Sequence, residues 1–232
     1  MKKLLIIVPA LAFMAGMLIN GCKKDVSHNQ TSGINNNVSF TEEFVSLDYL
    51  LANKGWEIKE NSSTYTNAVW SQGWYGQDKT GMWFGFPAYS YSSEKTEYAN
   101  SYINNDFDPV FNVSSWLISP VFKVKNGDKI SFFSRCDSAS TGSNRLQIRL
   151  SNTAATGITN NVPGSVGNFT ELLLDINSSQ SANGFPKDWT RYEYTFSGLS
   201  GLTEIRLAFR HYIENCTEKS GIGIDQFKFQ AN

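Results

Sequence analysis

The chain has few of the residues on which several common protein activities depend. Its 232 residues include 20 Lys and Arg against 21 Asp and Glu, which gives a net charge of −1. Because binding to phosphates needs a basic excess or stripe, these numbers argue against a nucleic acid as a partner. The two histidines and three cysteines show no metal-binding spacing, and the sequence contains no Gly-rich phosphate loop. What remains is a weakly charged chain in which aromatic residues make up 14% of the total.

The one long apolar run lies at the N-terminus. Two lysines precede a stretch from Leu4 to Met17, which is too short to span a bilayer comfortably and indicates a secretion signal. The residues from Leu18 to Cys22 resemble the lipobox of bacterial lipoproteins, in which the cysteine is lipidated and becomes the new N-terminus. We therefore predict a signal peptide over residues 1–21 and a lipid anchor on Cys22, with an ordinary signal and an incidental cysteine as the alternative. This predicts a membrane-tethered lipoprotein, in the outer membrane of a Gram-negative bacterium and exposed at the cell surface.

Two further regions follow the signal. Residues 22–37 comprise Cys22 and a polar segment without apolar periodicity, which predicts a flexible linker. Residues 38–232 contain short apolar runs bounded by Gly, Asn, Ser and Pro, a pattern typical of strands joined by turns. The clearest runs are Trp116–Val124, Lys129–Ser134, Arg145–Ser151, Thr190–Phe196, Thr203–Tyr212 and Gly223–Phe229.

The apolar residues in these runs recur with a period of two. Leu146, Ile148 and Leu150 are expected to face a core while the polar residues between them face outward, and residues 205–209 repeat the pattern. Asn126-Gly127-Asp128 predicts a tight turn that joins neighbouring strands into a hairpin. Only Leu47 to Lys54 suggests a helix, and a short one. The predicted fold is all-β, a two-sheet antiparallel β-sandwich of the jelly-roll type.

Six motifs occur in one order along this domain: Glu42-Glu43-Phe44, Gly55-Trp56-Glu57-Ile58, Ser115–Pro120, Ile130–Arg135, Arg206–His211 and Gly223–Phe227. Their order resembles that of the choice-of-anchor J, or cleaved-adhesin, domains of secreted bacterial proteins, which are similar in fold to MAM domains and carbohydrate-binding modules. The resemblance covers roughly residues 40–230. It implies a surface-displayed binding domain.

The same resemblance implies a structural calcium ion where the first strand passes the last. Glu42 or Glu43 and Asp225 occupy the matching positions, and hard cations of this kind take six to eight oxygen ligands. The family's second acid after Asp225 is Gln226 here, so the set is incomplete. The alternative is that Asp225 is a strand-edge acid and that the two glutamates are solvated.

The segment from Trp70 to Tyr91 gathers eight aromatic residues among Gly, Ser and Gln. Aromatic faces stack on sugar rings while neighbouring polar groups bond to hydroxyls, so this segment is a candidate platform for an extracellular glycan. Trp74, Tyr75, Tyr89 and Tyr91 are the candidate contacts. Residues 82–86 are the part that a further buried strand would explain better.

Two modifications are also predicted. Export permits a disulfide between Cys136 and Cys216 if the strands that they follow are neighbours, and two separate buried thiols are the alternative. Asp137-Ser138-Ala139 resembles an O-glycosylation acceptor of some Gram-negative bacteria, with Ser138 as the acceptor, although an Asp-initiated turn explains the tripeptide equally.

No catalytic constellation is recognisable. His211 is the only histidine in the predicted domain, and no Gly-x-Ser-x-Gly elbow accompanies it. We therefore expect a non-catalytic binding domain, either carbohydrate-binding or adhesive. Two alternatives stay open: a glycan hydrolase that uses two carboxylates, and a structural or assembly subunit whose partner is a surface protein.

Overall fold

The computed structural model describes residues 37–63, 67–89, 97–104, 109–140 and 142–232. Contacts divide the chain into residues 1–30 and 31–232, and every described residue belongs to the second unit. The signal peptide, the lipidation of Cys22 and the linker therefore stay predictions. No helix in the described ranges is long and apolar enough to cross a membrane.

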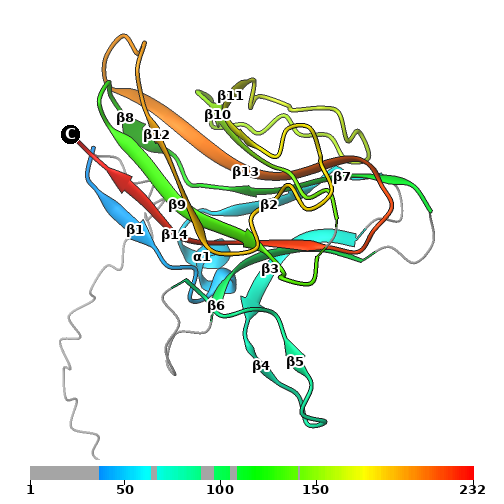
Figure 1. Ribbon diagram of the computed structural model, residues 1–232. Coiled ribbons are helices and arrows are strands. Elements are labelled where there is room, and N and C mark those ends of the chain that lie inside the picture. The colour runs from blue at the N-terminus through cyan, green and yellow to red at the C-terminus, as the bar shows by residue number, and fades with distance from the viewer. Residues whose placement is uncertain (1–36, 64–66, 90–96, 105–108, 141) are drawn as a thin grey trace, which may run out of the picture. The chain divides into compact units, whose positions relative to one another are not determined.

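Two six-stranded antiparallel sheets make up the domain (Figure 1). The first sheet has the order β12 (Thr190–Thr195), β9 (Lys129–Cys136), β14 (Gly221–Gln230), β6 (Glu97–Asn104) and β3 (Asn67–Trp74), with β1 (Phe40–Glu42) paired to β14. The second has the order β11 (Glu171–Ile176), β10 (Leu146–Ser151), β13 (Thr203–Cys216), β7 (Phe111–Ile118) and β2 (Glu57–Glu60), with β8 (Phe122–Val124) paired to β13. The chain crosses from sheet to sheet between β8 and β9, β9 and β10, and β11 and β12, as a jelly roll requires. The predicted sandwich is confirmed.

The core lies between the sheets and follows the predicted alternation. Leu146, Ile148 and Leu150 are buried in the main apolar cluster. Phe209 of the second sheet meets two rings of the first edge to face, Phe132 at 5.2 Å and Phe227 at 5.4 Å between centroids. Such contacts join the sheets by close packing of aromatic side chains.

The smaller elements flank the sheets. The predicted helix is α1 (Leu47–Asn53), in which the Tyr49 backbone N–H donates to the Oγ of the N-cap residue Ser46 at 3.3 Å. The strands β4 (Gly76–Gln77) and β5 (Trp83–Phe84) form a separate hairpin that extends away from the two sheets (Figure 1).

Two details of the strand prediction are wrong. The turn at Asn126-Gly127-Asp128 exists, but β8 before it pairs with β13 while β9 after it belongs to the first sheet, so it joins two sheets instead of a hairpin. The run Trp116–Val124 is divided into β7 and β8 at Ser119 and Pro120. Proline has no N–H for a ladder, and the chain leaves the strand there.

The predicted disulfide is not formed. Cys136 and Cys216 are both free and buried. Their strands, β9 and β13, lie in different sheets, and each thiol lies against a backbone carbonyl, that of Phe185 or that of Glu218. The alternative of two separate buried thiols describes the structure.

The outer face of the second sheet, which points away from the core, is covered in part by the segment that joins β10 to β11. Arg210 is buried there, with its guanidinium carbon 4.6 Å from the centroid of Trp116 and 3.8 Å from that of Tyr212. Phe169, from the segment that joins β10 to β11, lies over Trp116. Gln147 faces outward as predicted, yet its side chain is buried on this covered face. Its side-chain oxygen accepts a hydrogen bond from Arg210 at 3.1 Å.

Candidate functional site

The outer face of the first sheet is arranged differently. Along β6, alternate side chains belong to opposite faces: one set is Ala99, Ser101 and Ile103, which are buried toward the core, and the other is Tyr98, Asn100 and Tyr102. Ile222 and Ile224 of the adjacent β14 belong to the core, so the glycines beside them lie on the outer face. This leaves room above the sheet.

Glycine at position 223 allows an aromatic pair to lie flat on β14. A Cβ atom there would come within 2.8 Å of the Phe86 ring and 2.9 Å of the Tyr98 ring. Phe86 stacks on Tyr98 at 4.5 Å between centroids, and its backbone N–H donates to the Tyr98 hydroxyl at 3.2 Å. Burial raises the pKa of Tyr98 to about 12, so this hydroxyl stays protonated. The pair makes one end of the site rigid.

Glycine at position 85 sets the course of the chain next to this pair. Its φ is +67°, in the left-handed region, and a Cβ there would clash with the Trp74 carbonyl oxygen. This conformation carries the chain from β5 to Phe86 and leaves the Phe84 side chain 42% exposed.

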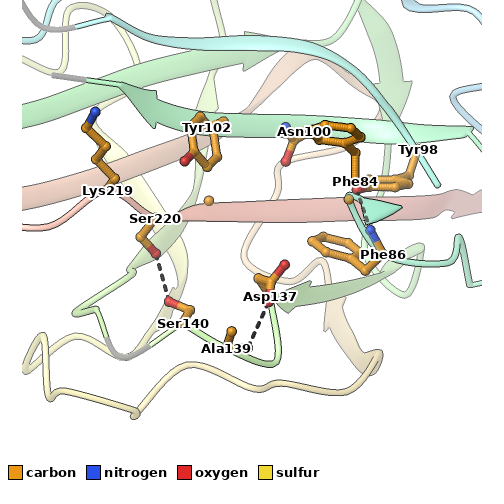
Figure 2. Close-up of a pocket in the computed structure, with 12 residues that line it drawn as sticks. Phe84, Phe86, Tyr98, Asn100, Tyr102, Asp137, Ala139, Ser140, Lys219 and Ser220 are labelled. Carbon is orange, nitrogen blue, oxygen red and sulfur yellow. Dashed lines mark hydrogen bonds between the residues drawn. The ribbon is translucent and has the colours of Figure 1, made fainter. Parts of the chain in front are cut away.

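A pocket of about 490 Å³ lies beside these residues. It is lined by Phe84, Gly85, Phe86, Tyr98, Asn100, Tyr102, Asp137, Ala139, Ser140, Lys219, Ser220 and Gly221. Figure 2 shows Tyr98, Asn100 and Tyr102 in a row along one strand, with Asp137, Ser140 and Ser220 across the hollow from them. Residues far apart in the sequence thus meet at one end of β14.

The pocket combines exposed rings with hydrogen-bonding groups. Phe84 and Tyr102 are 42% and 49% exposed, and Asn100 between them brings an amide with both donor and acceptor atoms. On the other side, the hydroxyls of Ser140 and Ser220 lie 2.9 Å apart. Rings with few but definite polar groups are typical of small-molecule and saccharide sites.

The predicted glycan contacts differ in their exposure and in their position relative to the pocket. Trp74 is 47% exposed and contacts Phe84 at 6.4 Å between centroids, which places it beside the pocket but not in its lining. Tyr75 is half-buried, and Tyr89 stacks on Phe133 at 3.5 Å elsewhere on the face. Tyr91 lies outside the described residues.

The expected buried strand at residues 82–86 is only partly present. Phe86 is buried, but Phe84 is exposed, and β5 pairs with β4 alone. Asn100 and Tyr102 are not among the contacts that the sequence predicts. The alternation in Glu97–Asn104 was the available signal, because it places Tyr98, Asn100 and Tyr102 on one face.

The predicted calcium ligands make bonds of their own. The Asp225 carboxylate is buried and accepts the backbone N–H groups of Tyr89 at 2.9 Å and Gln226 at 2.7 Å. Glu42 accepts the Phe44 N–H at 3.2 Å, and burial raises its pKa. Glu43 adjoins it, and no three acidic, histidine or cysteine side chains gather at one point within the described ranges. These side chains do not by themselves fit a sphere of six to eight oxygens, and a calcium ion stays a prediction.

Two further residues bear on chemistry. His211 is fully buried with both ring nitrogens bonded, as expected for a packed side chain. Ser138 is exposed in a turn whose Asp137 carboxylate accepts the Ala139 N–H at 2.7 Å, so the Asp-initiated turn exists and the glycosylation stays a prediction.

Comparison with known proteins finds likeness in structure alone. No family model and no curated protein sequence matches the chain. The K1 cleaved adhesin domain of Lys-gingipain from Porphyromonas gingivalis superposes with a TM-score of 0.52 at 16% identity, over 84% of this chain and 99% of that domain. The K3 domain of the same protein gives 0.47 at 14% identity, over 84% and 100%. A structure of carbohydrate-binding modules of the β-sandwich superfamily gives 0.42 at 10% identity, over 76% and 57%. The chain therefore has a cleaved-adhesin-like fold.

Proposed function

We propose that this protein is a cell-envelope lipoprotein whose β-sandwich binds glycan chains without catalysis, through the pocket on the outer face of the first sheet. The observation that carries the proposal is the pair of exposed rings, Phe84 and Tyr102, on either side of the Asn100 amide. Aromatic faces cover the apolar side of a sugar ring, and an amide bonds to its hydroxyls.

The spacing of these groups favours a chain over a single sugar. Phe84 lies at the Tyr98 end of the pocket, because the next residue, Gly85, lies beside the Tyr98 hydroxyl. Tyr98 and Tyr102 are four residues apart on β6, which places their Cα atoms about 13 Å apart at the usual rise of a strand. One pyranose ring does not reach both exposed rings, whereas an oligosaccharide does.

The described end of the predicted linker lies far from the pocket. Gly221 at the start of β14 lines the pocket, whereas Phe229 near its end pairs with Phe40 of β1. These two points on β14 are roughly 25 Å apart at the rise of a strand. The buried Asp128 carboxylate accepts hydrogen bonds from Asn37 and Asn232, so Asn37, the last residue of the predicted linker, lies at the end opposite the pocket.

The pocket supports recognition more than hydrolysis. Asp137 is the one carboxylate among the described residues that line it. Glycoside hydrolysis by the usual mechanisms needs two carboxylates that face each other across the bond. The word adhesin in the name of the K1 domain, with which this chain shares a fold, agrees with a binding role.

The test is binding by the full chain, purified in detergent, to xylohexaose, laminarihexaose, mannohexaose and chitohexaose by calorimetry, followed by a glycan array. Tyr102→Ala and Phe84→Ala are each expected to weaken the tightest of these interactions about tenfold, the value of one stacked ring. Tyr49→Ala is the matched control, since Tyr49 is exposed on α1 outside the pocket. Unchanged binding by both pocket variants would show that the oligosaccharide does not bind in this pocket.

A protein partner is the second candidate, and the β4–β5 hairpin favours it. Trp74, Met82 and Phe84 are all more than two-fifths exposed on or beside this hairpin. Neighbouring exposed apolar side chains of this kind mark interaction surfaces. If the chain is an assembly subunit, a defined protein will co-purify after gentle detergent extraction and will be lost on Met82→Ser, while oligosaccharides will not compete for it.

A further inference from the structure

A chain of hydrogen bonds links the core to the pocket wall. His211 is fully buried, with Nδ1 2.9 Å from the Ser101 hydroxyl and Nε2 3.2 Å from the Asn144 side-chain oxygen. The Asn144 side-chain nitrogen donates to Ser220 Oγ at 2.5 Å and to Ser140 Oγ at 3.3 Å. Ser140 and Ser220 line the pocket, whereas the other three residues do not.

The direction of each bond follows from the orientation of the Asn144 amide. An amide oxygen only accepts, so Nε2 of His211 carries the ring hydrogen, and Nδ1 accepts the hydrogen of Ser101. Burial lowers the pKa of His211 to about 3, so the ring is neutral and has one hydrogen to give. The Asn144 amide is thereby held with its oxygen toward the imidazole and its nitrogen toward the serines.

This orientation determines what the serines offer a ligand. Both hydroxyl oxygens accept from Asn144, and at 2.9 Å one hydroxyl donates to the other. One hydroxyl hydrogen of the pair is left, and when Ser140 carries it, a described neighbour that can accept it is the Cys136 thiol. Sulfur is a weak acceptor, so an oxygen atom in the pocket is the stronger partner for that hydrogen.

We propose that His211 is a positioning residue of the pocket: through Asn144 it makes the Ser140–Ser220 wall a hydrogen-bond donor to an acceptor oxygen of the ligand. The alternative amide orientation, with oxygen toward the serines, would draw both hydroxyl hydrogens inward and leave the wall without a donor. The part of this inference that concerns the ligand rests on the proposed function, and the part that concerns the amide does not.

Two substitutions of His211 separate its two bonds. In His211→Gln the amide nitrogen takes the place of Nε2 and keeps the bond to Asn144. In His211→Asn the shorter amide takes the place of Nδ1, keeps Ser101 and loses Asn144. Binding is measured with whichever of the four hexasaccharides named above the wild-type chain binds most tightly, at a temperature where thermal unfolding shows every variant folded.

We expect affinity to fall about fivefold in His211→Asn, the worth of one hydrogen bond, and less than about twofold in His211→Gln. Ser101→Ala, which removes the bond on the far side of the ring, is the control and should also change affinity less than about twofold. Equal affinities for the two His211 variants would overturn the proposal, whether both match the wild type or both are weakened alike.

A second measurement needs no variant and no ligand. Nitrogen-15 NMR of the wild-type imidazole should show hydrogen on Nε2 and none on Nδ1 from pH 5 to pH 8. A hydrogen on Nδ1 would mean that Asn144 turns its nitrogen toward the ring, and would overturn the proposal. If none of the four sugars binds, the proposed function fails on that panel while this spectrum still decides the orientation of Asn144.

Discussion

The outer faces of the two sheets differ in what lies on them. On the second sheet, Phe169 covers Trp116, and the buried Arg210 guanidinium contacts Trp116 and donates to Gln147. On the first sheet, small residues at Gly221 and Gly223 leave a pocket, and Phe84 and Tyr102 keep their rings partly exposed. Both faces carry aromatic and polar side chains, so residue type alone does not distinguish them.

The difference shows where binding energy is still available. A ring that is already packed against a guanidinium and a second ring has little apolar surface left to bury, whereas a half-exposed ring beside a pocket has much. We therefore propose that the closed face contributes stability and the open face recognition.

Trp116→Ala should be the most damaging change. It removes a fully buried ring beneath Phe169 and Arg210, and such truncations lower the free energy of unfolding by about 3–5 kcal/mol. Urea denaturation measures the loss, and Leu172→Ala on β11, where the side chain is exposed, should cost less than about 1 kcal/mol. Loss of sugar binding by folded Trp116→Ala would contradict the division of roles.

Glu60→Gln should stabilise the protein in alkaline solution. Burial raises the pKa of Glu60 from 4.5 to about 7, so the native state favours the protonated carboxyl. Its stability contribution is complete below pH 4.5 and is lost as the pH rises through 7. At pH 8 the variant should exceed the wild type by up to about 3 kcal/mol, and at pH 4 the two should agree.

The corresponding measurement is urea denaturation at several pH values. Glu171→Gln, at the exposed start of β11, controls for the loss of a surface charge and should leave a difference near zero at both pH values. A wild type whose stability relative to Glu60→Gln is the same at pH 4 and pH 8 would show that the pKa of Glu60 is not raised in the native state.

Gly223→Ala should affect the open face in particular. The added methyl group meets the stacked rings of Phe86 and Tyr98, and overpacking of this kind costs about 1–3 kcal/mol. Because these rings form one end of the pocket, affinity for the best hexasaccharide should also fall. Gly164→Ala, where a Cβ has open space, is the matched control, and equal effects of the two variants on affinity would count against the pocket.

Trp74→Ala should have the smallest effect on binding. Trp74 lies outside the pocket lining and touches it through Phe84, so calorimetry should show about a twofold to threefold loss of affinity, less than for Phe84→Ala. Tyr89→Ala is the comparison, because Tyr89 is similarly exposed but stacks on Phe133 away from the pocket. A larger loss from Tyr89→Ala than from Trp74→Ala would move the site along the face.

The sequence predicts the sandwich because the alternation of apolar and polar residues within each strand shows which of its faces is buried. The alternation at Leu146, Ile148 and Leu150 is visible in the strand alone, without knowledge of its neighbours, and all three side chains are buried in the structure. No comparable pattern within a strand shows which other strand it pairs with. The turn at Asn126-Gly127-Asp128 has hairpin chemistry, yet the strands on its two sides join different sheets.

The pocket was harder to predict for the same reason. Its walls come from β6, from the segment after β9 and from the residues before β14, and only the fold brings Tyr102, Asp137 and Ser220 together. The density of aromatic residues in Trp70–Tyr91 pointed to a segment that supplies Phe84 and Phe86 to the pocket lining, but these two were expected in a buried strand and the predicted contacts are not in the lining. It did not indicate which rings are packed, because Trp70 and Trp74 have the same residue type and opposite burial.

The most direct test of the central claim is a crystal structure of the protein soaked with its best-bound hexasaccharide. Sugar density is expected in the pocket, with one ring on Phe84, another on Tyr102 and a hydroxyl bonded to Asn100. Density on the closed face of the second sheet, or on the β4–β5 hairpin with the pocket empty, would contradict it.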